Sequence, residues 1–218
     1  MSQIAEIIQL SREKKFLPNL QKHQQYAMIL LSVNSPEKLC RLLKTPMPYL
    51  EEIINAPVYK HYTVKKKRGG ERHIFAPDKS LKDIQKRLNY FLQAYYLWIK
   101  PNEVHGFVIN PRYLGVHCNI VENAKVHTGK KHVLNIDLKD FFPNISAKRI
   151  KNLFTSHLFN YNEQIAIALT LLQHTNPNSR QVHQHRRFCQ ILFVIIWMQT
   201  CGIFVRKTHY SFHAMPTT

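Results

Sequence analysis

Apolar residues recur at helical spacing through the first part of the chain. Ser35-Pro36 is typical of a helix N-cap followed by proline at the first helical position, and Thr45-Pro46 repeats this signal. Apolar residues follow both signals three and four positions apart: Leu39, Leu42, Leu43, Leu50, Ile53 and Ile54. The pattern predicts helices from residue 4 to about residue 55, with packing faces and no visible chemistry.

The pattern changes to that of two short strands between Tyr59 and Pro77. Tyr62-Thr63-Val64 precede the pair Gly69-Gly70, and His73-Ile74-Phe75 follow it. Lysines and arginines surround the glycines. The sequence therefore predicts a basic hairpin that turns at the two glycines.

A long amphipathic helix is predicted after the hairpin. Ser80 is expected to cap it, with Asp83 three residues further on, and the helical spacing continues to Pro101. Residues 102–130 carry several glycines and a proline and are expected to be irregular. The buried face of the helix is expected to consist of Leu81, Ile84, Leu88, Phe91, Leu92, Tyr95 and Trp98.

A strand is predicted over residues 132–138, because apolar and polar residues alternate there. The alternation places Asp137 on the face opposite Leu134, Ile136 and Leu138. Two helices are expected to follow: one capped by Ser146 and reaching Leu158, and one from Ile165 to Leu172. Helices and strands in this order predict an α+β fold.

Charge narrows the functions that this chain can have. Its 218 residues include 31 Lys and Arg against 13 Asp and Glu, a formal net charge of +18, which favours a polyanionic partner.

The longest apolar run, residues 191–198, is far shorter than the ~20 residues that span a bilayer. Four isolated cysteines and the absence of a secretory signal favour a cytoplasmic location with reduced thiols. Five His and Cys residues in the middle of the chain lack the paired spacing of a zinc site: His105, His117, Cys118, His127 and His132.

The string VLNIDLKDFFPNI, residues 133–145, carries the clearest candidate chemistry. A carboxylate at a strand end beside a tight turn is well placed to hold Mg²⁺, since backbone carbonyls and solvent complete its shell. Taken alone the string is weak evidence for a metal site, because without other motifs Asp137 is better explained as an ordinary exposed strand residue and Asp140 as a turn or cap residue. The string resembles motif A of the reverse transcriptases, especially the bacterial retron and group II intron-like branch.

Two further strings strengthen this resemblance. KKKRGGERHIFAP (65–77) with LKDIQ (81–85) resembles the first fingers motif, and VHGFV (104–108) with NAKVH (123–127) resembles the second block. The three motifs occur in family order. One segment departs from the family pattern: VINPRYLGVHCNIVE (108–122), where many relatives have a shorter glycine-arginine-serine segment. The template-strand contact that relatives make there is therefore not assigned to residues of this chain.

The resemblance implies catalytic roles for three residues of the motif A string. Asp137 matches the palm aspartate that binds both catalytic Mg²⁺ ions, and the carbonyl of Leu138 matches an added metal ligand. Phe142 matches the aromatic steric gate that favours deoxynucleotides, although core packing is the alternative for this ring. Asp140 is interpreted as a structural cap.

The resemblance also implies a nucleotide-binding role for the hairpin. Arg72, with Lys65 or Lys66, matches the fingers cations that hold the triphosphate, and a guanidinium can grip phosphate through two hydrogen bonds. Lys67 and Arg68 are expected to contact nucleic acid. The alternative is a solvated basic hairpin without a ligand.

The family architecture divides the chain into four expected regions of a right-hand polymerase. These are a helical N-terminal region (1–55), fingers (56–132), a partial palm (133–177) and a tail (178–218), with no thumb. The expected partners are a structured RNA template, a DNA primer strand and deoxynucleoside triphosphates. The biological role stays open between retron DNA synthesis, antiviral defence and intron mobility.

Residues 178–218 lack the expected palm motifs, and no acidic residue follows Glu163. Two family motifs are missing, the LPxGAPTSP loop and the YxDD turn. However, the coding DNA can be read in a shifted frame, in which each codon consists of the last base of one original codon and the first two bases of the next. In that frame the codons of residues 178–191 can encode LPTGAPTSPVLSN, and those of residues 213–218 are compatible with RYADD. We therefore predict a frame change near residues 173–178, an out-of-frame tail, and little polymerase activity for this chain alone.

Three other classes remain as alternatives. A non-catalytic RNA-binding module would keep the basic fingers, and a group II intron maturase fragment would share all three motifs. An unrelated basic DNA-binding protein is disfavoured, because no helix-turn-helix or zinc-finger spacing is present.

Overall fold

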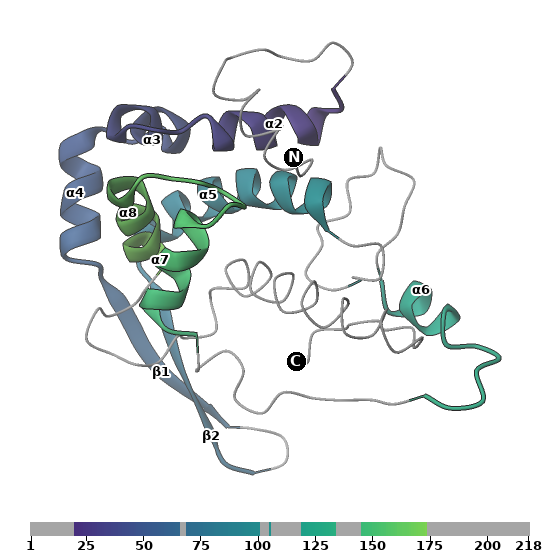
Figure 1. Ribbon diagram of the computed structural model, residues 1–218. Helices are drawn as coiled ribbons and strands as arrows, with labels where there is room; N and C mark the ends of the chain where they lie inside the picture. The colour runs from purple at the N-terminus through teal and green to yellow at the C-terminus, as the bar shows by residue number, and fades with distance from the viewer. Residues whose placement is uncertain (1–19, 66–68, 101–104, 106–118, 134–144, 174–218) are drawn as a thin grey trace.

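The computed structural model describes residues 20–65, 69–100, 105, 119–133 and 145–173 (Figure 1). Helices and one two-stranded antiparallel sheet form this part of the chain, in agreement with the expected α+β class. In chain order the elements are α2 (Lys22–Leu31), α3 (Pro36–Leu43), α4 (Met47–Asn55), β1 (Tyr59–Lys65), β2 (Glu71–Pro77), α5 (Lys79–Ile99), α6 (Ile120–Lys125), α7 (Ala147–Thr155) and α8 (Glu163–Gln173).

Helix α5 is the longest element and lies at the centre of the helical body. Figure 1 shows α2 running alongside α5, α3 and α4 continuing around the body, and α7 and α8 between them, while β1 and β2 project away from the helices. No helix in the described segments is both long and apolar enough to cross a membrane. The fold therefore consists of a helical body from which one hairpin extends.

Two of the predicted helix starts are confirmed by their caps. The Ser35 hydroxyl accepts a hydrogen bond from the Lys38 amide at 3.4 Å, and Pro36 is the first residue of α3. Ser146 caps α7 in the same way, accepting from the Arg149 amide at 3.4 Å. Each hydroxyl satisfies one of the backbone N–H groups that a first helical turn leaves without a partner.

Two other predicted caps are wrong. Asp78, not Ser80, caps α5, because its carboxylate reaches the amides of both Ser80 (3.3 Å) and Leu81 (3.0 Å). Thr45 does not cap α4, whose N-cap is Pro46; its hydroxyl donates to the Leu43 carbonyl at 3.0 Å instead. In both places a local side-chain hydrogen bond competes with the cap that the sequence favours.

Two predicted boundaries also differ from the structure. Helix α7 ends at Thr155 and does not reach Leu158, because Ser156 takes an extended conformation (ψ 170°). The chain then turns at Asn160 (φ 50°), and the Tyr161 amide donates back to the Phe154 carbonyl at 3.0 Å. The segment expected to be irregular, residues 102–130, contains the short helix α6. Its cap is Asn119, whose side chain accepts from the Glu122 amide at 2.9 Å.

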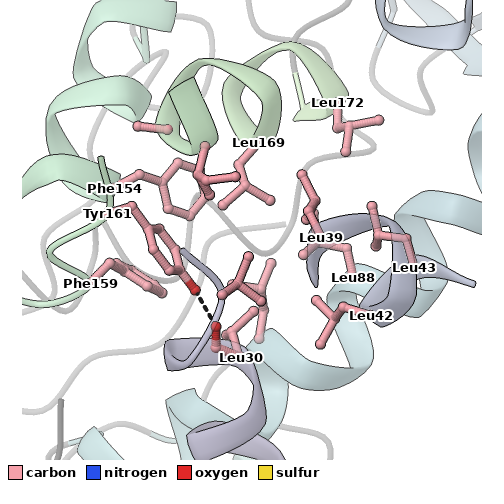
Figure 2. Close-up of a cluster of buried hydrophobic side chains, with 14 of the residues drawn as sticks. Leu30, Leu39, Leu42, Leu43, Leu88, Phe154, Phe159, Tyr161, Leu169 and Leu172 are labelled. Atoms are coloured by element: carbon pink, nitrogen blue, oxygen red, sulfur yellow. Dashed lines mark hydrogen bonds between the residues drawn. The ribbon is translucent and has the colours of Figure 1, made fainter. Parts of the chain in front are cut away.

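One hydrophobic core joins all the helices of the body. Figure 2 shows aromatic side chains from α7 and the turn after it on one side, and leucines of α3 on the other. Phe159 is fully buried and meets Tyr95 (5.0 Å between ring centroids) and Phe154 (5.1 Å) edge to face. The Tyr161 hydroxyl donates to the Leu30 carbonyl at 2.8 Å (Figure 2). Residues far apart in the sequence, from Ala27 to Leu172, therefore stabilise one another.

Polar side chains of α5 bind the ends of two other helices. Arg87 donates to the carbonyls of Leu43 (2.8 Å) and Lys44 (3.2 Å), where α3 ends. Gln85 donates to the carbonyl of Leu172 at 2.8 Å, near the end of α8. Carbonyls in the last turn of a helix have no partner within the helix, and a cation is favourable there. These two side chains thus fix α3 and α8 on α5.

Burial of His23 predicts a pH-dependent stability. This α2 side chain is 7% exposed, and burial lowers its pKa from the ordinary 6.5. Because the unfolded chain takes up a proton at His23 more readily than the folded chain, this contribution to stability is complete above pH 6.5 and is lost as the pH falls below it. Urea unfolding of His23→Gln, compared at about pH 7.5 and about pH 5.5, is expected to show a smaller loss of stability on acidification than the unsubstituted chain.

The matched control for this experiment is His157→Gln, since His157 is exposed and lies outside the core. It is expected to keep the pH dependence of the unsubstituted chain. An equal loss of pH dependence in both variants would contradict the assignment to His23.

Candidate functional site

The predicted basic hairpin is confirmed, and its turn lies where the two glycines stand. β1 and β2 pair antiparallel from Tyr59 opposite Pro77 to Lys65 opposite Glu71. Gly69 (φ 88°) and Gly70 (φ 85°) adopt a conformation that side-chain-bearing residues rarely take, and no neighbouring atom lies within 4 Å of where a Cβ would stand. The backbone conformation, and not a lack of space, therefore requires glycine at these positions.

The base of the hairpin is fixed on the helical body. The amide of Asp78 donates to the Val58 carbonyl at 3.0 Å, which closes the two chain ends at the base of the hairpin. Tyr59 is half-buried against the hydrophobic core, and Pro77, its partner in the register, is buried. Asp78 also caps α5, so one residue connects the second strand directly to the central helix.

Beyond this base the first strand of the hairpin is open to solvent. Every residue of β1 from Lys60 to Lys65 is exposed, and the hairpin extends away from the helices (Figure 1). The register brings Lys65 and Arg72 to the turn end of the ladder, on neighbouring rungs, with Lys65 opposite Glu71 and Arg72 opposite Val64. Two of the residues predicted to hold a triphosphate therefore lie at the turn end of the ladder, on successive rungs that alternate between its two faces.

A cluster of imidazoles on the hairpin was missed by the sequence analysis. His61 Nε2 lies 3.2 Å from His73 Nδ1, and Thr63 Oγ1 lies 3.3 Å from the same His73 atom. The two imidazole rings are stacked, with centroids 5.3 Å apart, and Phe75 lies 4.4 Å from the ring of His61. Counting back along both strands from the glycine turn would have placed these four residues on one face.

His105, the described residue of the first half of the second motif, lies near the second half. Asn123 of α6 is 8% exposed, and His105 Nδ1 and Asn123 Oδ1 are buried without a hydrogen-bond partner. Burial, together with the charge of Lys100, lowers the pKa of His105, while Glu122 raises it and His127 lowers it. The influence of Glu122 and His127 is consistent with His105 lying near α6 and the residues that follow it.

The predicted catalytic centre lies outside the described residues. This holds for Asp137, Leu138, Asp140 and Phe142, for the strand expected over 132–138 apart from its first two residues, and for Lys66, Lys67 and Arg68. The structure does describe the chain that follows motif A, where Ile145 is 2% exposed in the core and Ser146 begins α7. Within the described ranges, no group of three or more His, Cys, Asp or Glu side chains could hold a metal ion.

Comparison with known proteins identifies the class to which this chain is similar. No protein-family model matches it. About half of the chain is similar to retron reverse transcriptases, so the relationship predicted from the three motifs is confirmed for that half.

Three relatives illustrate the similarity. The Retron Ec86 reverse transcriptase of Escherichia coli is 35% identical over 117 residues, 51% of this chain and 32% of the relative. The Retron Se72 reverse transcriptase of Salmonella heidelberg is 34% identical over 117 residues (52% and 28%), and the Retron Mx65 reverse transcriptase of Myxococcus xanthus is 33% identical over 114 residues (52% and 24%). The chain thus matches a third or less of the length of each of these relatives.

Proposed function

We propose that this chain carries the fingers and the first part of the palm of an RNA-directed DNA polymerase of the retron type. The observation that carries the proposal is the identity of 33–35% to three retron reverse transcriptases. The exposed strand β1 supports it, because Lys65 lies where a nucleotide triphosphate can approach and the register places Arg72 on the next rung. The proposed regions are 1–55, 56–132, 133–177 and 178–218, as the motifs predict.

The proposed chemistry is nucleotidyl transfer. The 3′-oxygen of a DNA primer attacks the α-phosphorus of a deoxynucleoside triphosphate, and pyrophosphate leaves. Mg²⁺, when bound at Asp137 and the Leu138 carbonyl, would neutralise the charge that develops on the attacking and leaving oxygens. Phe142 would exclude a 2′-hydroxyl beneath the sugar.

The proposed role of the hairpin is electrostatic. Lys65, Lys66 and Arg72 would hold the phosphates of the incoming nucleotide, and Lys67 and Arg68 would contact the nucleic acid backbone. The net charge of +18 suits an RNA template and a primer–template duplex, which are bound largely through phosphates. Binding of this kind weakens steeply as salt is raised.

We further propose that residues 178–218 are read in the wrong frame and that this chain alone does not polymerise. Transfer by two metals requires more than one palm carboxylate, and the second frame is compatible with the RYADD sequence that the first frame lacks. Sequencing of the DNA that encodes the chain tests the frame directly. A confirmed DNA sequence that offers no way to join the two frames would refute this part of the proposal.

Primer extension tests the proposed activity. The chain as it stands and a chain joined to the second frame near residues 173–178 are each incubated with an RNA template, a DNA primer, deoxynucleotides and Mg²⁺. Only the joined chain is expected to extend the primer. Robust extension by the unjoined chain would show that the tail does not inactivate it, and no extension by either would count against a polymerase.

The exposed hairpin favours a second candidate, a non-catalytic RNA-binding module. Its solvent-facing lysines need no metal centre to bind phosphate. This candidate predicts salt-sensitive RNA binding, measured by fluorescence anisotropy, in a chain that gives no primer extension even when the frames are joined. The polymerase proposal predicts both binding and extension in the joined chain.

A further inference from the structure

We propose that His61 and His73 form a two-histidine site for a late transition-metal ion such as Zn²⁺ or Cu²⁺, with the Thr63 hydroxyl oxygen as a third donor. The site bridges β1 and β2 on one face of the hairpin. The proposal does not depend on the polymerase activity.

The geometry carries this proposal. His61 Nε2 and His73 Nδ1 are 3.2 Å apart. Two nitrogens bound to one tetrahedral Zn²⁺, each about 2.0–2.1 Å from it, are separated by about 3.3–3.4 Å. The separation of the two imidazole nitrogens is therefore close to that in a two-histidine site, and an ion bound there would replace the direct contact between them. Thr63 Oγ1 lies 3.3 Å from the same His73 nitrogen.

The strand pairing holds these donors in place. His61 stands opposite Phe75, and Thr63 stands opposite His73, so the imidazoles occupy diagonal positions on adjacent rungs of one face. Phe75 packs 4.4 Å from the His61 ring and restricts its orientation. All three donor residues are exposed, so an ion can reach them from solvent without unfolding the hairpin.

The donor set selects the kind of ion. Imidazole nitrogens suit Zn²⁺, Cu²⁺ and Ni²⁺, whereas Mg²⁺ prefers carboxylate and carbonyl oxygens. Cu²⁺ is expected to bind most tightly, following the general order of divalent affinities. On the same face towards the turn the register places Lys65 and Glu71, one cation and one anion, so their formal charges cancel near the site.

Metal binding would join the two strands next to the predicted nucleotide-binding cations. The Thr63–His73 rung is followed by Val64 opposite Arg72 and then by Lys65 opposite Glu71. An ion at this rung would fix both strands just before the turn. The consequence is a hairpin whose end, with Lys65 and Arg72, is held more rigidly in the metal-bound state.

Calorimetric titration with Zn²⁺ tests the proposal on the full chain without a histidine tag. The unsubstituted chain is expected to bind one more equivalent of Zn²⁺ than His61→Gln or His73→Gln, and excess Mg²⁺ is not expected to compete. His157→Gln removes an exposed histidine elsewhere and is expected to keep that equivalent. Binding is expected to weaken on acidification, because protons compete with metal for the imidazole nitrogens.

Two further measurements make the test independent of any change in folding. Thr63→His adds a third imidazole to the cluster and is expected to tighten Zn²⁺ binding. Cu²⁺ bound to the unsubstituted chain is expected to show couplings to two imidazole nitrogens by electron paramagnetic resonance, and to lose one of them in His61→Gln. The proposal is overturned if His61→Gln and His73→Gln bind as much Zn²⁺ as the unsubstituted chain, or if His157→Gln loses the same equivalent.

Discussion

Asp137→Asn is expected to reduce primer extension by the frame-joined chain roughly 100- to 1000-fold or more. The substitution keeps the size of the side chain and removes the negative charge that we propose holds Mg²⁺. Charge stabilisation by a metal ion contributes several kcal/mol to a transition state of this kind, and this contribution is lost with the carboxylate. Steady-state primer extension at saturating Mg²⁺ and deoxynucleotide measures the effect.

The matched control is Glu52→Gln, which also replaces a carboxylate by its amide, on an exposed side chain of α4 outside the three motifs. A single charge on an exposed helix surface contributes little. Glu52→Gln is expected to extend primers at the rate of the unsubstituted joined chain. If both variants retained that rate, Asp137 would not be the metal ligand. RNA binding unchanged by Asp137→Asn would show that the loss lies in the chemical step.

Phe159→Ala is expected to lower the free energy of unfolding by about 3–5 kcal/mol. Phe159 is fully buried in the turn between α7 and α8 and packs edge to face on Tyr95 of α5 and Phe154 of α7. Removing the ring leaves a cavity where three parts of the chain meet. Since small proteins are stable by only about 5–15 kcal/mol, this one substitution is expected to remove a large part of the total.

Tyr90→Ala is the control for this prediction, because the Tyr90 ring is 52% exposed on α5. It is expected to cost much less, although its edge contacts with Tyr26 and Phe91 are lost. Urea unfolding followed by circular dichroism measures both variants. Equal and small effects would show that the turn between α7 and α8 is not part of the cooperative core.

The core and the hairpin contribute differently to the proposed function. The core fixes α5 against α2, α3 and α8, and Asp78 connects α5 to the base of β2. Beyond that base strand β1 of the hairpin is exposed. A rigid body that presents a solvated basic arm is suited to bind a charged ligand from solution, with the ligand and any bound ion restricting the arm.

The local sequence pattern predicted most of the helices and the turn of the hairpin. The apolar spacing predicted α3, α4, α5, α7 and α8, and the two glycines predicted the hairpin turn, because helical periodicity and positive-φ glycine are properties of neighbouring residues. The order of three motifs predicted the relationship to retron reverse transcriptases, which the comparisons confirm for half of the chain. Asp137, Leu138, Phe142 and the reading frame of the tail stay predictions from sequence.

Tertiary structure decided what depends on residues distant in the sequence. Asp78 replaced Ser80 as the cap of α5, and the Ser80 hydroxyl instead accepts a hydrogen bond from Tyr49 at 2.7 Å, 31 residues away. Helix α7 ended early because the chain turns there to bury Leu158 and Phe159. The contact between His61 and His73 depends on the register of two strands. Sequence alone shows which residues favour an element, while the choice among competing partners depends on which of them the folded chain brings within reach.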